Sequence, residues 1–253
     1  MYNIKVLKFG GGIFTDQYVM PQMADVITQD LNMGHKLMVV VSAMGKTTRE
    51  LENKIPTIID KPNLRERDML LSNGENIAAS LFAMHLIDQG IKARSFTGPQ
   101  VPIYTDNNYS EANILDIPRK NMDNFFAKND VAIITGFQGV GKDGDITTLG
   151  FNGSDTTAFA LMYYFKALSC VLYKDVNGVY DKDPKQNIDA QLYKYINYRE
   201  VLNGNTSGII HKKALELCSK IFTQYDPEIT IRNINLSQNK FTTICKKQTE
   251  FHR

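Results

Sequence analysis

Three glycine-rich turns, each placed after a short β-prone segment, are the first candidates for chemistry in this sequence of 253 residues. They cover residues 10–12, 136–144 and 150–155. Glycines at a junction between a strand and a helix let backbone N–H groups approach an anion, and the dipole of the helix N-terminus favours negative charge there. One such turn is explained by tight chain reversal alone. Three of them in one chain predict a phosphate-binding site.

Lys8 stands at the end of the first β-prone segment, just before the first glycine turn. In a regular strand its side chain shares one face with those of Ile4 and Val6, so a buried sheet would hold an ammonium group that needs an anionic partner. A lysine at the end of a strand is also explained by solvation alone. The adjoining glycine turn favours a role for Lys8 beside bound phosphate.

Two better-known nucleotide motifs are excluded by single positions. Residues 136–143 nearly match the P-loop pattern G-x-x-x-x-G-K-[ST], but Asp143 replaces the hydroxyl that would hold Mg²⁺ and adds negative charge beside the phosphates. Residues 10–15 lack the third glycine of the dinucleotide-binding pattern G-x-G-x-x-G. The turns therefore predict neither a P-loop nor an NAD site.

The elements that must position these turns alternate between strand and helix. Residues 37–41 and 131–135 are apolar without alternation, as in parallel strands covered on both faces. A glycine-rich loop is expected over residues 136–153. The predicted fold is α/β, a three-layer αβα sandwich with a mostly parallel central sheet, whose ligands collect at the carboxyl ends of the strands. The sequence predicts strands over residues 4–9, 37–41, 92–96, 101–104, 131–135, 170–174, 228–232 and 242–245, and helices over 18–33, 64–89 with a break at 73–74, 118–128, 154–167 and 211–223.

The composition favours a soluble protein with a small-molecule partner. Twenty-nine lysines and arginines against 27 acidic residues give a net charge of +2, so nothing points to nucleic acid or to a membrane surface. The three cysteines and four histidines are scattered, so neither a disulfide framework nor a metal site made of protein ligands is expected. The sequence lacks a secretory signal pattern and a membrane-spanning apolar run, and a cytoplasmic location is expected.

Seven motifs stand in the order found in aspartokinases of the amino-acid kinase superfamily, which this sequence resembles from Lys8 to about Lys185. The resemblance implies ATP-dependent phosphorylation of a carboxylate to an acyl phosphate, with Mg²⁺ bound largely through the nucleotide. The motifs are KFGG at 8–11, VVSAM at 40–44, SNGE at 72–75, TDN at 105–107, GFxG at 136–139, TTLGxxGSD at 147–155 and KDVNGVYxxDP at 174–184.

The resemblance also implies a domain organisation. It predicts one kinase domain over residues 1–253, with an acceptor-substrate lobe over about 1–130 and a nucleotide lobe over about 131–253. Because the sequence stops shortly after the last predicted strand, no appended ACT regulatory domain is expected. A homodimer is possible, since dimers are common in the resembling family.

Specific roles follow from the resemblance, residue by residue. Lys8 would stabilise charge on the transferring phosphoryl group, and Asp155 would hold that lysine through a charge-assisted hydrogen bond. Glu75 would contact the α-amino group of the substrate. The other implied substrate-binding residues are Ser42, Thr48 and Ser154, and the implied nucleotide-binding residues are Gly10, Gly11, Gly12, Gly150, Gly153, Lys174, Asp175, Tyr180, Asp183 and Lys185.

Without the resemblance, several of these residues have plainer explanations. Asp155 and Glu75 suit the N-terminus of a helix through the dipole alone. Ser42 and Thr48 are equally typical helix caps. Asp183, followed by a proline, is typical of a turn.

Three positions depart from the family pattern. Phe151 replaces the arginine that clamps the α-carboxylate of the amino acid, and a phenyl ring cannot supply such a bidentate contact. Either Arg49 or Arg119 takes over, or the acceptor is not aspartate. Gly208 replaces a phosphate-contacting lysine, for which Lys212 or Lys213 is a candidate substitute. Gly12 replaces a threonine, which removes a hydroxyl near the phosphates.

These departures leave alternatives open. The favoured hypothesis is phosphorylation of the side-chain carboxylate of aspartate or of a related small carboxylate. A second is a kinase of the same fold for another small acceptor, a hydroxyl or phosphonate compound. A third is a catalytically inactive nucleotide-binding module.

Overall fold

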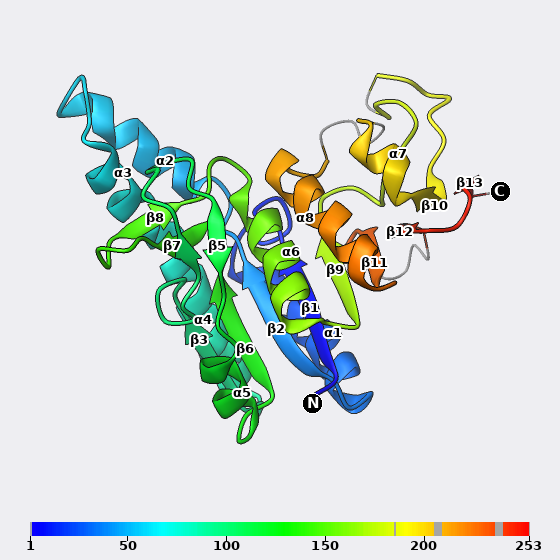
Figure 1. The fold of residues 1–253 in the computed structure, drawn as a ribbon, viewed down its shortest axis with the longest axis horizontal. Coiled ribbons are helices and arrows are strands. Elements are labelled where there is room, and N and C mark those ends of the chain that lie inside the picture. The colour runs from blue at the N-terminus through cyan, green and yellow to red at the C-terminus, as the bar shows by residue number, and fades with distance from the viewer. Residues whose placement is uncertain (1, 185, 205–208, 236–239, 253) are drawn as a thin grey trace.

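The central element of the fold is a nine-stranded sheet with the strand order β13-β10-β12-β11-β9-β1-β2-β6-β3 (Figure 1). The computed structural model describes residues 2–184, 186–204, 209–235 and 240–252. Every pairing in this sheet is parallel except β10 with β13 and β11 with β12. The strands are β1 (Ile4–Phe9), β2 (Lys36–Val41), β3 (Ala93–Phe96), β6 (Val131–Thr135), β9 (Ser169–Tyr173), β10 (Tyr193–Asn197), β11 (Glu228–Arg232), β12 (Phe241–Cys245) and β13 (Glu250–Phe251).

Helices cover both faces of this sheet, which confirms the three-layer prediction. Alternate side chains of β1 divide between two apolar cores: Ile4 and Val6 pack with one set of helices, and Leu7 and Phe9 with the other. The first core includes α5 (Lys120–Phe126), α6 (Gly153–Phe165) and α8 (Lys212–Gln224), and the second includes α1 (Met20–Asn32) and α4 (Asn73–Asp88). Figure 1 shows α6 lying across β1 and β2. Each fully buried aliphatic or aromatic side chain contributes about 1.5–3 kcal/mol, so these two cores hold the layers together.

A second, four-stranded sheet corrects the expected loop over residues 136–153. Its strand order is β5-β4-β7-β8, and β7 (Gln138–Val140) and β8 (Ile146–Thr148) form an antiparallel hairpin. The other strands are β4 (Tyr104–Thr105) and β5 (Ile114–Asp116), so the strand predicted at 101–104 begins later along the chain. Three-residue strands are too short to show an alternating pattern, which is why glycine content alone suggested a loop.

The glycines of this hairpin serve packing, and that the second glycine turn cradles phosphate stays a prediction. A Cβ atom added at Gly139 would lie 2.4 Å from Cγ2 of Thr105, and one at Gly141 would lie 2.4 Å from Oδ1 of Asn107. Glycine is required there because β4 and its following loop approach the backbone of the hairpin closely.

Some short elements escaped prediction because they carry no apolar stripe. The helix α2 (Thr47–Lys54) has no buried residue, and α7 (Tyr198–Leu202) has only five residues. The helix predicted over 64–89 is divided, as expected, into α3 (Leu64–Leu71) and α4. A 3-10 turn, Gln17–Val19, precedes α1. Among the described residues, no helix combines the length and apolarity needed to cross a membrane.

Both sheets combine strands from the two proposed lobes. β6 pairs with β2 and β3, and β7 pairs with β4. Residues 131–148 therefore pack with elements of the first half of the chain. The division near residue 130 stays a prediction.

Candidate functional site

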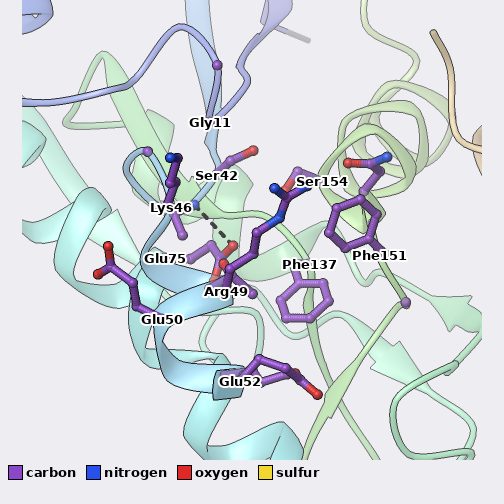
Figure 2. Close-up of a pocket in the computed structure, with 18 of the residues that line it drawn as sticks. Gly11, Ser42, Lys46, Arg49, Glu50, Glu52, Glu75, Phe137, Phe151 and Ser154 are labelled. Atoms are coloured by element: carbon purple, nitrogen blue, oxygen red, sulfur yellow. Dashed lines mark hydrogen bonds between the residues drawn. The ribbon is translucent and has the colours of Figure 1, made fainter. Parts of the chain in front are cut away.

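A cavity of about 1090 Å³ opens at the carboxyl ends of β1 and β2. The first glycine turn, the loop after β2, α2, the first turn of α4 and the loop before α6 surround it, as Figure 2 shows. Its position agrees with the rule that ligands of parallel sheets collect at the strand ends. The predicted site residues that line it are Lys8, Gly11, Gly12, Ser42, Thr48, Glu75, Gly150, Gly153, Ser154 and Asp175.

Lys8 and Lys174 share one carboxylate, that of Asp155, beside this cavity. Nζ of Lys8 lies 2.8 Å from Oδ1 of Asp155, and Nζ of Lys174 lies 2.7 Å from Oδ2. Lys174 also donates to the carbonyl oxygen of Ile209. The parallel pairing of β1 with β9 brings the two lysines side by side, and Asp155 approaches from the first turn of α6. The contact between Lys8 and Asp155 that the resemblance implies is therefore present.

The three charges of this cluster are buried together. Only 1% of the Asp155 side chain is exposed, against 8% for Lys8 and 15% for Lys174. Burial alone would raise the pKa of Asp155, but the adjacent ammonium groups of Lys8 and Lys174 lower it to about 2. Burial lowers the pKa of Lys174 against the opposing effect of Asp155. With both lysines protonated the cluster carries one net positive charge, which favours an anion at this edge of the cavity.

Glu75 presents a second buried carboxyl to the cavity. It is 3% exposed, and its Oε1 accepts a hydrogen bond of 3.0 Å from the backbone N–H of Ala43. Its Oε2 is buried and has no hydrogen-bond partner among the described residues. Burial raises the pKa of Glu75 to about 8, against smaller opposing effects of the Ala43 hydrogen bond and the Lys8 charge. Glu75 therefore holds a proton near neutral pH when no cationic ligand is present.

Gly74 explains why this carboxyl lies so deep. A Cβ atom at position 74 would lie 2.8 Å from Cβ of Ala43 and 3.7 Å from Oγ1 of Thr48. The absence of a side chain lets the first turn of α4 pack directly against the loop and helix that follow β2. The motif at 72–75 therefore brings Glu75 next to residues 43–48.

Stability should depend on pH through Glu75. A carboxyl whose pKa rises from 4.5 to about 8 on folding keeps a proton that the unfolded chain loses, so wild-type stability falls as pH rises through this range. We expect Glu75→Gln to gain melting temperature relative to wild type between pH 5 and pH 8. Differential scanning calorimetry at both pH values measures the gap. Glu66→Gln, which removes a carboxylate on a 65% exposed side chain, should show no such widening, and parallel curves for wild type and Glu75→Gln would contradict the raised pKa.

The first glycine turn lies directly against the charged groups. A Cβ atom at Gly10 would lie 3.2 Å from Nζ of Lys8, and one at Gly12 would lie 3.2 Å from Cγ of Asp175. Asp175 thus occupies the space beside position 12, where the family pattern has threonine. The Gly12 departure leaves room for this carboxylate at the cavity wall.

Several predicted nucleotide-binding residues do not line the cavity. Gly10 is buried beneath Lys8, and Lys174 faces Asp155. Tyr180 forms an isolated antiparallel bridge with Leu192. The backbone carbonyl of Asp183 accepts hydrogen bonds from the turn that follows it, as the turn interpretation expected. Lys185 lies outside the described residues.

The candidate replacements for the arginine lost at position 151 and for the lysine lost at position 208 differ in whether they are free to bind a ligand in the cavity. Arg49 lines the cavity, whereas Arg119 pairs with Asp123 at 3.4 Å, lies over the ring of Phe165 and does not line it. Lys213 donates to three backbone carbonyls and pairs with Glu111, so it is not available to a phosphate group. Gly208 and the side chain of Lys212 lie outside the described part of the structure.

Sequence reasoning missed part of the cavity wall. Several of the lining residues that were not predicted come from α2 and α3, where charged side chains without an apolar stripe are typical of solvent-exposed surface, and the others come from loops. Asp68, fully buried, accepts hydrogen bonds from Ser110 and Thr148 and so ties α3 to β8 and to the loop after β4. The lining residues not predicted to bind a ligand include Thr15, Lys46, Glu50, Glu52, Arg67, Leu71, Ser110, Glu111, Phe137 and Asn152.

Comparisons with known proteins agree with this architecture. The aspartokinase of Geobacillus stearothermophilus is 37% identical over 253 residues, covering 99% of this chain and 61% of the relative. The crystal structure of aspartate kinase from Synechocystis superposes with a TM-score of 0.80 and 32% identity, over 96% of this chain and 40% of that one. E. coli aspartokinase III in complex with aspartate and ADP shares the fold, with a TM-score of 0.78 at 22% identity, over 97% of this chain and 65% of that one.

This chain therefore spans between about two fifths and two thirds of the length of these relatives. The sequence model of the amino acid kinase family matches residues 3–231, which is most of the chain. That match includes strands β1 to β10, the glycine turn at 10–12 and the Lys8–Asp155–Lys174 cluster. The chain belongs to the amino acid kinase family.

Proposed function

We propose that this chain catalyses the ATP-dependent phosphorylation of the side-chain carboxylate of aspartate, or of a related small acid, to an acyl phosphate. The observation that carries the proposal is the buried Lys8–Asp155–Lys174 cluster, whose Lys8 lines the same cavity as the partly unpaired carboxyl of Glu75. A positive site for a phosphoryl group and an acidic site for an amino group thus share one space. The similarity to proteins named aspartokinase supports the same substrate class.

The proposed reaction needs charge neutralisation and positioning more than proton transfer. An acceptor carboxylate is already ionised at neutral pH, so no general base is required. Its oxygen attacks the γ-phosphorus of ATP, the bond from that phosphorus to the bridging oxygen breaks, and the electron pair leaves with ADP. Lys8 stabilises the charge on the transferring group. Lys174 acts through Asp155, by fixing the carboxylate that orients Lys8.

The nucleotide would lie along the glycine turns. The backbone of Gly11 and Gly12 and the first turn of α6, which begins at Gly153, line the cavity on the Lys8 side and suit phosphate oxygens. Gly150 completes this wall with a backbone φ of 88°, a conformation that glycine adopts freely. On the strength of the family resemblance alone, we assign Asp175 to the ribose, Tyr180 to the base, and Asp183 to the nucleotide-binding residues without a specific contact.

The residues present fit a Mg²⁺ ion held mainly by the nucleotide. Among the described residues no group of three carboxylate, histidine or cysteine side chains could hold a metal by itself. Asp175 supplies one carboxylate at the cavity wall beside Gly12. A bound Mg²⁺ would neutralise phosphate charge and leave Lys8 to face the transferring group.

The acceptor would lie between Glu75 and the hydroxyl groups of the cavity. Oε2 of Glu75 is buried, and no other described group donates a hydrogen bond to it, so its lone pairs can accept one from an α-ammonium group. Such a cation would favour the ionised carboxylate, so binding near neutral pH should release a proton from Glu75. Ser42, Thr48 and Ser154 line the cavity and would contact the acceptor or the transferring phosphoryl group.

Trapping of the acyl phosphate tests this proposal directly. The purified chain is incubated with MgATP, hydroxylamine and one acid from a panel of L-aspartate, L-glutamate and succinate, and hydroxamate and ADP are measured together. We expect hydroxamate with aspartate, in step with ADP. ADP release without hydroxamate, on addition of a hydroxyl or phosphonate acceptor, would indicate the alternative kinase. ATP binding by calorimetry without turnover of any acceptor would indicate an inactive module.

We also propose a homodimer, on the strength of the family resemblance, and a cytoplasmic location, on the strength of the amino-acid sequence. Exposed apolar side chains of Ile77, Leu81 and Met84 lie on one side of α4 and support the dimer.

A further inference from the structure

We propose that Arg49 binds the α-carboxylate of the acceptor amino acid, in place of the arginine that Phe151 has replaced. This inference rests on the proposed function and adds the residue that selects an amino acid among small acids. It starts from Phe151, which is 65% exposed and lines the cavity. A phenyl ring has no donor for a carboxylate, so a cation must come from elsewhere on the wall.

Two of the four cationic side chains that line the cavity among the described residues are already paired. Lys8 pairs with Asp155. Arg67 binds both oxygens of Glu52, at 3.0 Å and 2.9 Å, and donates to Ser110 at 2.8 Å. Among the described lining residues, Lys46 and Arg49 are the cations without an ion-pair partner.

The position of Arg49 favours it over Lys46. Figure 2 shows the Arg49 side chain extending towards Ser154 and Phe151, while Lys46 lies nearer Gly11 and Ser42. Arg49 thus reaches the part of the wall where the replaced arginine would stand. Lys46 lies towards the glycine turn, on the side proposed for phosphate.

Packing of α2 against α4 places Arg49 near the proposed amino-group site. A Cβ atom at Gly74 would lie 3.7 Å from Oγ1 of Thr48, so the first turns of the two helices, which carry Glu75 and Arg49, lie close together. Figure 2 shows both side chains on the cavity side of these helices. The pair offers one negative and one positive group, which match the ammonium and carboxylate groups of an amino acid.

Neighbouring acids leave the Arg49 guanidinium available. Glu52 is held by Arg67, and Glu111 by Lys213 at 3.0 Å. Figure 2 shows the Glu50 carboxylate directed away from Arg49. A planar guanidinium fork binds a carboxylate through two parallel hydrogen bonds, which an ammonium group such as that of Lys46 cannot reproduce.

Comparison of L-aspartate with its α-amide, in which a neutral amide replaces the α-carboxylate, tests the assignment. We expect Arg49→Gln to lower kcat/KM for aspartate by about 100-fold, because a bidentate charged contact is lost. The KM for ATP and kcat/KM for the α-amide should stay within about twofold, since neither depends on this contact. The wild-type preference for aspartate over the amide should therefore collapse. Arg119→Gln, which changes an arginine away from the cavity, is the matched control and should keep the preference.

A second experiment moves the arginine from position 49 to position 151. Adding Phe151→Arg to Arg49→Gln should restore the preference for aspartate over its α-amide, because a guanidinium again faces the same part of the cavity. An unchanged preference in Arg49→Gln, or its loss in Lys46→Ala instead, would overturn the assignment. If the wild-type chain forms no hydroxamate, the proposed function fails, and calorimetric binding of aspartate to wild type and Arg49→Gln then decides the assignment by itself.

Discussion

Replacing Lys8 by methionine is expected to lower kcat for hydroxamate formation by about 1000-fold, the effect of removing a cation that stabilises a transferring phosphoryl group. Methionine keeps the length of the side chain but leaves no charge beside the γ-phosphate. The KM for the acceptor should change little, because Lys8 is proposed to act on the transferring group. Steady-state kinetics with saturating MgATP and aspartate measures both quantities.

Lys5→Met is the matched control for this substitution. Lys5 stands on the same strand and is partly buried, and its Nζ pairs with Oδ1 of Asp30 at 2.6 Å. It does not line the cavity. We expect its kcat to stay within about twofold of wild type. Equal activity of Lys8→Met and wild type would exclude the proposed mechanism and favour the inactive nucleotide-binding module.

Asp155→Asn is expected to destabilise the fold by about 3–5 kcal/mol, because removing one partner leaves two ammonium groups buried without their counter-charge. For a chain of this length the melting temperature should fall by roughly 10 °C. Activity should fall as well, since Lys8 loses the group that orients it. Chemical denaturation and thermal scans measure the stability, and hydroxamate assays below the melting transition measure the activity.

The pH dependence of the stability lost in Asp155→Asn shows whether the charge of Asp155 is the cause. The pKa of Asp155 falls from 3.8 to about 2 on folding, so its stabilising contribution is present above pH 3.8 and is lost as pH falls through about 2. The gap between wild type and Asp155→Asn should therefore narrow in acid. A double variant, Lys8→Met with Asp155→Asn, should lose less than the sum of the single losses, because the two groups interact. Additive losses, or a gap that does not narrow, would show that Asp155 acts by packing alone.

The local pattern of apolar residues was sufficient to predict the layered fold. The unalternating strands at residues 37–41 and 131–135 required cover on both faces, and the helices found there supply it. The same pattern did not predict the elements that are short or that lack an apolar face. The hairpin of β7 and β8 and the helix α2 belong to this class, and α2 carries Arg49.

The candidate site also combines contacts that the local sequence predicted with contacts that it did not. The run from Ile4 through Val6 to Lys8 already required an anionic partner for a buried lysine, and the family motifs pointed to Asp155. Nothing local indicated that Lys174 would share that carboxylate. The two lysines meet because β1 pairs with β9, far apart in sequence.

By itself the sequence determined which residue types carry charge and which stretches must be buried, because those properties belong to each side chain and its near neighbours. Only the tertiary structure decided which charges meet and how dry their surroundings are. Packing of Gly74 against Ala43 removes water from Glu75 and raises its pKa to about 8, and pairing of Arg67 with Glu52 leaves Arg49 unpaired. Desolvation and ion pairing act through space, so they depend on contacts that no single segment of the chain contains.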